Sequence, residues 1–386
     1  MATDGTAGVN RRAFLGAIGI AGTAVACAPS VPVPPSSATA PQPAGAAGDQ
    51  AAWEQDWESL IAAAKQEGRL SFLSLPGAGY RKLLDAFEAA FPGIVAEAQS
   101  GTSATYTQRI LKEREAGVYS FDVAQITPGT PLRQLKPQGV WAPIRPAMFR
   151  PDILDDTRWI GGFDAGFLDR DKQYAFNYEY TVTHNFAINT DLVGKDEIKA
   201  LTDLLDPKWK GRMIFSDVRV GSTFQSMMVV RLKLGEAVVR RLVVDQQPEF
   251  TRDERQIVEA LVRGKYPVAL GATPRVLQEF LDQGLGKNVW YLDLPEADCI
   301  FGACVWLFDK APHPNAARLF VNWVHTREAQ ALCSRYLATN SRRTDVPPID
   351  PGTVAAPGKA YVQVNAEAMF PETDKTQKLL QDLVLR

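Results

Sequence analysis

The chain has 386 residues, 46% of them hydrophobic, and a formal net charge of −2 at pH 7. The near-neutral charge and the lack of a basic cluster interleaved with aromatic residues exclude a nucleic-acid-binding protein. The hydrophobic content allows sizeable cores, and the 336 residues from Ala51 onward suit two domains better than one.

The N-terminal segment has the features of an export signal. Arg11 and Arg12 precede an uncharged apolar run from Ala13 to Ala26, and this run is shorter than the about 20 residues of a membrane-spanning helix. A positive start, a short apolar core and small residues at its end are typical of a signal peptide. We therefore expect residues 1–26 to be removed on export, so that the mature chain begins at Cys27.

Two motifs in this segment resemble known targeting and lipidation signals. Arg11–Leu15 resembles the twin-arginine export signal, which is read on proteins that leave the cytoplasm folded, although Asn10 and Gly16 depart from its usual pattern. Ala24–Cys27 resembles a lipobox, in which the cysteine carries a lipid, with Ala24 in place of the usual leucine. The resemblances imply twin-arginine export to the periplasm or the outer face of the cytoplasmic membrane. They also imply that the membrane is contacted only through a lipid on Cys27.

The composition of residues 27–50 predicts an extended tether between the membrane and the folded domains. Most of them are proline, alanine and serine, and large apolar side chains are almost absent. Such a segment buries too little surface to offset its ordering entropy, so we expect it to stay extended and mobile. At ~3 Å per residue it could hold a domain up to ~70 Å from a membrane surface.

Three cysteines follow Cys27, at positions 299, 304 and 333. An odd number forbids a complete disulfide framework. A chain that folds before export folds in a reducing compartment, so we interpret the three as small buried hydrophobic residues with at most one bridge.

From Ala51 onward the pattern alternates between helix and strand. A helix is predicted from the apolar spacing of Trp53, Trp57, Leu60, Ile61 and Ala64, and Gly68 is placed to end it. Strands are then predicted over residues 69–75, 94–100 and 121–126, with helices over 80–91 and 104–117 between them. This alternation predicts a parallel sheet flanked by helices, whose ligand-facing loops follow the carboxyl ends of the strands.

A second unit of the same kind begins near residue 203. It contains a predicted strand over residues 212–217, a loop of small polar residues and a helix over 225–235. The sequence therefore predicts an α/β protein with two lobes, and ligands favour the crevice between two lobes.

Six segments, in order along the chain, resemble the signature segments of the extracellular solute-binding proteins of ABC importers. They resemble most the ferric-iron, thiamine and phosphonate group of that family. The segments are WESLIAAAKQEGRLSF, LLDAFEAAFPGI, RILKEREAGVYSFDV, FAINTDLV, LLDPKWKGRMIFSD and KAPHPNAARLFVNWVHTREAQ.

This resemblance implies a two-lobed periplasmic binding protein fold of type II with a hinge. It implies a first lobe of residues 51–184 and 303–343 and a second lobe of residues 185–302 and 344–386. The chain would cross between the lobes in the segments EYTVTHNFAI and CIFGACVWLF, which are apolar and β-rich enough to be strands. Such a protein is expected to be a monomer that captures a small ligand and delivers it to ABC permease subunits.

The resemblance places the site in loops at the strand ends, and most of these loops run straight into a helix. Helix N-terminal amides and the helix dipole together favour a negatively charged group. Ordinary turn and capping chemistry is the alternative interpretation of any one loop. The predicted ligand-binding residues are Gly77, Ala78, Gly79, Tyr80, Ser103, Thr105, Thr127, Tyr178, Arg219, Ser222, Thr223, Thr273 and Arg275.

The ligand is expected to be a small-molecule anion, an organic carboxylate or phosphonate, rather than ferric iron. Ferric ion prefers oxygen donors such as phenolate, and the iron-binding relatives commonly carry adjacent tyrosines in the segment that matches VALGATPRVLQEF, which has none here. A guanidinium group at Arg219 or Arg275 matches carboxylate and phosphonate oxygens. The alternatives are a solvated surface role for each arginine, and a core or lining role for Tyr80, Tyr174, Tyr178 and Tyr180.

Other functional classes find little support. The chain has no G-x-S-x-G, C-x-x-C, H-E-x-x-H or P-loop motif, and its three histidines are scattered. We expect neither a catalytic residue nor a cofactor nor a metal ligand among the site residues. His184 lies near the first crossing, where it could line the cleft or be a core histidine. An exported enzyme and a sensor subunit that reports its ligand to a membrane receptor stay open as alternatives.

Overall fold

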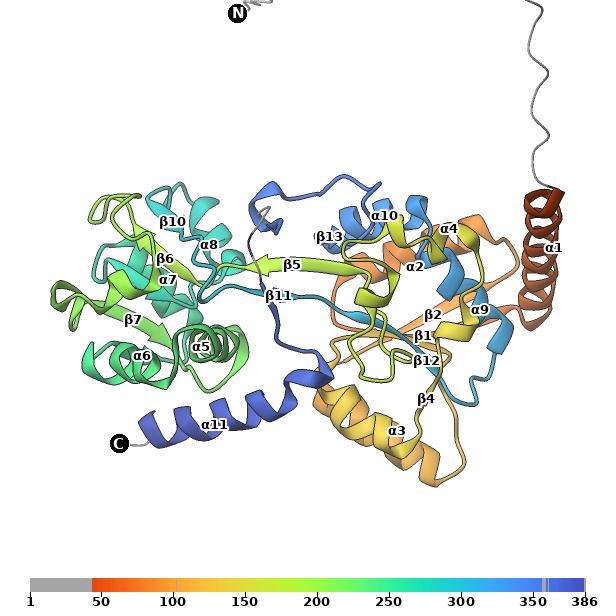
Figure 1. Ribbon diagram of the computed structural model, residues 1–386, viewed down its shortest axis with the longest axis horizontal. Helices are drawn as coiled ribbons and strands as arrows, with labels where there is room; N and C mark the ends of the chain where they lie inside the picture. The colour runs from red at the N-terminus through yellow and green to blue at the C-terminus, as the bar shows by residue number, and fades with distance from the viewer. Residues whose placement is uncertain (1–43, 102, 356–358, 360, 385–386) are drawn as a thin grey trace, which may run out of the picture. The chain divides into compact units, whose positions relative to one another are not determined.

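The computed structural model describes residues 44–101, 103–355, 359 and 361–384. The predicted signal peptide, Cys27 and the first part of the predicted tether lie outside these residues. The described chain is a mixed α/β structure with three sheets, which confirms the predicted fold class (Figure 1). No helix within the described ranges combines the length and the apolar character needed to cross a membrane.

The first helix, α1 (Ala44–Glu67), starts earlier than the sequence predicts. Its first seven residues fall in the segment that we expected to be extended. This difference has a simple cause, because the segment ends in an alanine-rich stretch, and alanine loses no side-chain entropy in a helix. The helix ends as predicted, where Gly68 adopts the left-handed conformation with φ 67°.

The first sheet has the strand order β2-β1-β3-β12-β4. Strand β1 is parallel to its neighbours β2 and β3, whereas β12 is antiparallel to β3 and β4. One face packs against α2, α9 and α10, and the other packs against α3. The bounds are β1 Arg69–Ser74, α2 Ala78–Ala90, β2 Val95–Ser100, α3 Ser103–Glu115, β3 Val123–Ile126, β4 Trp141–Ala142, α4 Pro151–Leu154, β12 Cys304–Phe308, α9 Pro314–Val324 and α10 Arg327–Leu337.

One apolar segment of this region forms two helices. The segment PNAARLFVNWVHTREAQALCSRY forms α9 and α10, separated by His325 and Thr326. The Thr326 side chain accepts a hydrogen bond from the Ala329 amide and so starts a new helix. The predicted strands and helices of residues 69–126 are confirmed to within a few residues at their ends.

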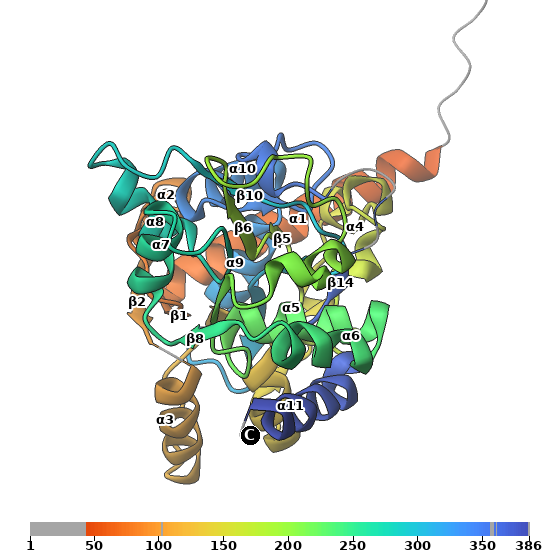
Figure 2. The same cartoon turned by 90° about the vertical axis from the view of Figure 1, so that its left-hand side faces the viewer.

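The second sheet has the order β10-β6-β9-β7-β8. Strand β7 is parallel to β8 and β9, while β6 is antiparallel to β9 and β10. Helices α7 and α8 cover one face, and α5 and α11 pack on the other (Figure 2). The bounds are β6 Phe186–Asn189, β7 Met213–Ser216, α5 Gly221–Leu234, α6 Glu236–Arg240, β8 Glu249–Thr251, α7 Glu254–Val262, β9 Val268–Leu270, α8 Pro274–Leu281, β10 Val289–Tyr291 and α11 Phe370–Val384.

A third, narrow sheet connects the two. We call it the crossing sheet, with the order β13-β5-β11-β14. Its strands are β5 (Glu179–Thr183), β11 (Cys299–Phe301), β13 (Asn340–Ser341) and β14 (Val362–Gln363). Strands β5 and β11 are antiparallel, and their continuations β6 and β12 enter the second and first sheets (Figure 1). The two predicted crossing segments are therefore strands, each interrupted by two residues.

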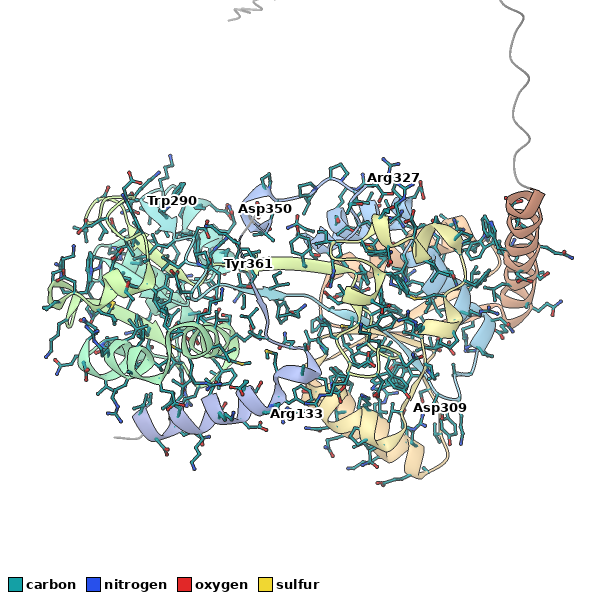
Figure 3. The ribbon with its side chains drawn as sticks, viewed as in Figure 1. Arg133, Trp290, Asp309, Arg327, Asp350 and Tyr361 are labelled. Atoms are coloured by element: carbon teal, nitrogen blue, oxygen red, sulfur yellow. The ribbon has the colours of Figure 1, made fainter. Side chains whose placement is uncertain are left out.

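The C-terminal helix α11 packs beside the second sheet and also contacts a residue from the lobe of the first sheet. Leu380 and Leu383 of α11 join the core around the second sheet. Near the start of α11, Arg133 donates to the Asp374 carboxylate at 2.9 Å (Figure 3). The cysteines at 299, 304 and 333 are all buried and unpaired, which confirms their interpretation as small core residues.

Candidate functional site

The predicted first-lobe loops meet at one edge of the first sheet. Ser74 at the end of β1 lies beside Ser100 of β2 and Gln125 of β3 in the parallel register. The Gly101 amide donates to the Ser74 carbonyl at 3.2 Å. The loops that lead to α2 and α3 and the loop Thr127–Thr130 therefore share the carboxyl edge of this sheet.

The second-lobe loops share an edge in the same way. Because β7, β8 and β9 are parallel, the loops after Ser216, Thr251 and Leu270 leave the sheet on one side. Gly271 is where two of these loops touch, since a side chain there would meet Ser216 and Thr223. Gly271 also has φ 91°, a conformation that favours glycine.

Both edges lie against the same face of the crossing sheet. Side chains alternate along a strand, so Glu179, Thr181 and Thr183 of β5 point to one side. Asn185 follows in the break between β5 and β6. Asn185 Nδ2 donates to the Ser222 carbonyl at 3.1 Å in the first turn of α5. At the other end, Glu179 is close enough to raise the pKa of Tyr80, in the first turn of α2, beyond the increase that burial causes. We call this side the site face.

The helices that start at the two edges have open N-termini. Neither α2 nor α5 has a side-chain cap or an acidic residue in its first turn. By contrast, Asp253 caps α7, and Thr326 caps α10. No side chain therefore caps the N-termini of α2 and α5, and an anion is the acceptor that a helix N-terminus favours.

The molecule already contains one carboxylate held in this way. Glu67 accepts hydrogen bonds from the Asn315 amide at 3.1 Å and the Ala316 amide at 2.8 Å, at the start of α9. Glu67 and the start of α9 therefore show how a carboxylate binds the N-terminal amides of a helix in this protein.

A positive cluster precedes α5. Arg219 forms two 2.8 Å hydrogen bonds to Asp217, and Arg252 approaches the same carboxylate at 2.9 Å. The hydrogen bonds from Arg219, and to a smaller extent the one from Arg252, hold the pKa of Asp217 well below its usual range. The three side chains carry one net positive charge, and they help to line a cavity of about 230 Å³ together with Phe250, Thr251 and Val384.

Several predicted site residues lie on the surface of these loops. Gly77, Ala78 and Thr105 are exposed, and Thr127, Ser222 and Thr273 are half-buried. Ser103 begins α3, but its side chain is not among those described. Gly79 has a packing role as well, because a side chain there would collide with the Tyr336 carbonyl of α10.

Other predicted site residues are held inside the protein. Tyr80 and Tyr178 lie in the core of the first lobe, with 8% and 0% of their surfaces exposed. Burial raises the pKa of both phenols. Thr223 is buried too, and its hydroxyl donates to the Asp217 and Val220 carbonyls at 2.9 and 3.0 Å. These three positions fit the alternative interpretation, core packing and loop support.

Arg275 differs from Arg219 in its surroundings. Its side chain is 75% exposed and pairs with Glu254 at 3.3 Å and Glu279 at 3.7 Å. This environment is typical of a solvated surface arginine, the alternative that the sequence left open. Arg219, by comparison, is only 24% exposed and lies at the edge of the second sheet.

The residues of the crossing sheet were missed at the sequence level. Thr181 and Thr183, on the site face, are half-buried, and Glu179 on the same face is buried. Burial raises the pKa of Glu179 to about 7, although its carboxylate accepts from the Ala303 amide at 3.0 Å. The signal was available, because E-Y-T-V-T alternates polar and apolar residues, which is typical of a strand with one polar face.

Comparisons with known proteins identify the family of this chain. Residues 82–360 match the family model described as "Bacterial extracellular solute-binding protein". No curated protein sequence matches the chain.

Solved structures show the same fold at low sequence identity. Iron-bound HitA from Pseudomonas aeruginosa is 18% identical with a TM-score of 0.57, over 82% of this chain and 99% of that one. The Trichodesmium protein IdiA (FutA), in complex with iron and citrate, is 17% identical with a TM-score of 0.64, over 83% and 100%. Ferric iron-binding protein A from Mannheimia haemolytica, in an open conformation, is 13% identical with a TM-score of 0.65, over 82% and 98%.

These neighbours are two-lobed periplasmic binding proteins, and at such identities they establish the fold alone. The family match covers most of the chain and describes binding proteins rather than enzymes. The chain therefore belongs to the bacterial extracellular solute-binding protein family.

Proposed function

We propose that this protein is the binding component of an ABC importer that captures a small organic carboxylate or phosphonate and delivers it to membrane permease subunits. The ligand would lie on the site face of the crossing sheet, between the first turns of α2 and α5. The observation that carries the proposal is that both of these helices start at a sheet edge without a side-chain cap and without an acidic residue.

The charge of the second-lobe edge supports an anion as ligand. The cluster of Arg219, Asp217 and Arg252 adds one net positive charge beside α5. The hydroxyl groups of Thr181, Thr183 and Ser222 supply neutral donors that suit carboxylate or phosphonate oxygens. Glu179, which would repel an anion when ionised, keeps its proton up to a pH of about 7.

Ferric iron is the second candidate, because several of the similar structures are of iron-bound or ferric iron-binding proteins. Those proteins are at most 18% identical to this one. Here Tyr80 and Tyr178 are buried with raised pKa values, which disfavours the phenolate form that a ferric ion prefers. The Trichodesmium structure contains citrate with its iron, so an organic carboxylate is compatible with this fold.

The proposal is tested by a thermal-shift screen of the full chain with mono-, di- and tricarboxylates, alkylphosphonates and ferric chloride. A ligand at 100 times its dissociation constant stabilises the native state by roughly 2.7 kcal/mol. We expect an organic anion to give this shift. Stabilisation by ferric chloride alone, with a visible tyrosinate absorption band, would place iron first. Turnover of any compound would instead indicate an enzyme.

Substitution of Ser222 tests the position of the site. Ser222→Asp places a carboxylate in the first turn of α5, where it stabilises the helix by about 0.3–1 kcal/mol. The same charge repels an anionic ligand, so we expect binding at least tenfold weaker with an unchanged or higher melting temperature. Ser222→Asn, of similar size and neutral, is the control and should bind within a few-fold of the unsubstituted protein. Equal binding by both variants would exclude this helix from the site.

The partner and the route of export are part of the same proposal. A sensor subunit would have the same fold, and adjacent permease and ATPase genes would distinguish the importer role. We propose that the protein works as a monomer in the periplasm, reached by the twin-arginine pathway, with a lipid on Cys27 as its membrane anchor.

A further inference from the structure

A histidine and two aspartates meet on the opposite face of the crossing sheet. His184 follows β5, and Asp298 immediately precedes β11, so both extend the antiparallel register Thr183 to Cys299 by one residue. By strand alternation they share a side with Tyr180 and Ile300 rather than with the site face. His184 Nδ1 lies 2.7 Å from Asp298 Oδ2.

A third possible ligand comes from the loop after β10. The Asp293 carboxylate is exposed, and one ligand atom each from Asp293, Asp298 and His184 lie within 4.8 Å of one another. The His184 Nε2 atom also lies 3.2 Å from the carbonyl of Gly352, two residues after Asp350, which is labelled in Figure 3. Three separate segments of the chain thus meet at this cluster.

One oxygen of the cluster is buried without a partner. The Asp298 side chain is 1% exposed. Its Oδ2 atom accepts from His184 and from the Leu294 amide at 3.0 Å. Its Oδ1 atom is buried and has no hydrogen-bond partner within the described part of the chain. A buried carboxylate oxygen without a donor is costly, and a bound cation would remove that cost.

The donor set points to a zinc ion. Zinc binds imidazole nitrogen and carboxylate oxygen at about 2.0–2.2 Å in a tetrahedron, which places its ligands about 3.4 Å apart. Binding requires the exposed Asp293 to move closer and the His184 Nδ1 and Asp298 Oδ2 atoms, now 2.7 Å apart, to separate slightly. At present the charge of Asp293 is neutralised by Lys359, whose Nζ atom lies 2.5 Å from Oδ2.

We propose that His184, Asp293 and Asp298 bind one zinc ion, with a water molecule as the fourth ligand, at a site separate from that of the transported ligand. The ion joins the chain after β5 to the chain before β11, at the second-lobe ends of the two crossing strands. It therefore fixes the second-lobe end of the hinge. The proposal does not depend on the identity of the transported ligand.

The test is a zinc titration of the metal-stripped full chain against a chromophoric chelator. We expect one equivalent of zinc to bind the unsubstituted protein. Asp293→Ala should weaken zinc binding at least about tenfold, since loss of even an outer-shell partner typically costs that much. Asp298→Asn and His184→Gln should weaken it similarly. Asp293 is exposed, so its variant keeps the test informative even where a change at the buried Asp298 prevents folding.

Two further variants separate a zinc site from a structural hydrogen bond. Lys359→Met removes the cation that competes for Asp293, and we expect zinc affinity to rise about two- to fivefold, the range of one surface ion pair. His313 is the matched control, because it pairs with the buried Asp122 at 2.9 Å but belongs to no group of three possible ligands among the described residues. His313→Gln should bind zinc as the unsubstituted protein does.

A cobalt titration gives an independent readout. Cobalt in place of zinc should produce visible absorption bands that disappear in His184→Gln and persist in His313→Gln. The proposal is overturned if the unsubstituted protein binds no zinc at 100 µM, or if Asp293→Ala and Lys359→Met both bind zinc with unchanged affinity.

Discussion

Glu179 occupies the position where the crossing sheet leaves the first lobe. Its carboxyl group lies between the Ala303 amide at 3.0 Å and the Thr339 hydroxyl at 3.4 Å, and only 6% of the residue is exposed. Burial is the main cause that raises its pKa from 4.5 to about 7, and the two hydrogen bonds only partly oppose it. A charge at this position is therefore costly to the native state.

This environment predicts a stability that depends on pH. Between pH 4.5 and about 7 the native state retains a proton on Glu179 that the unfolded chain has lost, so the free energy of unfolding falls as pH rises through this window. Glu179→Gln removes this loss, and at a pH of about 8 we expect it to be more stable than the unsubstituted protein by about 2–4 kcal/mol. At a pH of about 4 the variant and the unsubstituted protein should have similar free energies of unfolding.

Urea unfolding at the two pH values measures the difference. Glu97→Gln, at an exposed glutamate of β2, is the control and should behave as the unsubstituted protein at both. A Glu179→Gln variant that is equally destabilised at both pH values would contradict a buried neutral carboxyl group.

The two arginines predicted to contact the ligand should behave differently. Arg219→Ala leaves Asp217 with Arg252 alone, so the edge beside α5 loses its net positive charge. We expect anion affinity to fall about tenfold, or about 1.4 kcal/mol, with a smaller effect at high salt. Arg275→Ala changes a solvated position, so its anion affinity should stay within twofold of that of the unsubstituted protein. Calorimetric titration at two salt concentrations checks both, and an equal loss in both variants would mean that Arg275 reaches the ligand.

At the residue scale, the sequence predicted the positions of loops better than the burial and contacts of single side chains. It predicted strands that end within one residue of Ser74 and Ser216, because strand and helix patterns are local. It did not distinguish the buried Tyr178 from an exposed tyrosine, or Arg275 from Arg219. Those differences depend on neighbours that are distant in the sequence, such as His325 beside the Tyr178 ring.

Among the elements, the crossing sheet is held by a close approach of its two long strands. A side chain at Gly302, between β11 and β12, would overlap the Glu179 carbonyl and Asn177 Nδ2. We expect Gly302→Ala to destabilise the protein by about 1–3 kcal/mol, because the backbone atoms that it meets cannot rotate away. Gly129→Ala is the control, since a side chain there meets nothing within 4 Å. Thermal unfolding compares the two, and equal melting temperatures would mean that the strands can separate at no cost.

The third sheet could not be predicted from local pattern. Its strands come from four distant parts of the chain, and β13 and β14 have two residues each. Segments this short carry no periodic signal. The antiparallel placement of β12 and β6 in the two large sheets was missed for the same reason, since pairing depends on the fold and not on the strand's own sequence.

On the scale of the whole chain, the family and the two-lobed fold could be recognised because six segments keep their order and spacing from Trp53 onward. The N-terminal segment makes a prediction of its own. Replacing Arg11 and Arg12 by lysine should retain the precursor in the cytoplasm, because the twin-arginine receptor reads that pair. Cell fractionation checks this, and normal export of the double variant would mean that another pathway carries the protein.

Cys27 makes a separate prediction about anchoring. If the cysteine carries a lipid, Cys27→Ser should move the protein from the membrane to the soluble periplasmic fraction, because the acyl chains provide its attachment. The arginines remain intact in this variant, so export is unaffected. A Cys27→Ser protein that stays on the membrane would exclude the lipid anchor.

The arrangement of the site face predicts that the ligand closes the protein. Glu179 lies within electrostatic range of Tyr80 in α2, and Asn185 donates to α5; six residues of extended chain between them span about 20 Å. A small anion is shorter than this, so it can reach the amides of both helices only if the crossing strands bend. Each strand has a break where bending can occur, at His184 and Asn185 in one and at Gly302 and Ala303 in the other.

Small-angle X-ray scattering measures this closure directly. We expect the radius of gyration to fall when a saturating ligand from the thermal-shift screen is added, because contacts from both edges are satisfied together only in the closed state. Ser222→Asp, which repels the ligand from the second-lobe edge, should show no such decrease at the same concentration, whereas Ser222→Asn should close. Identical scattering with and without bound ligand would mean that one edge alone holds the anion and that the hinge takes no part in binding.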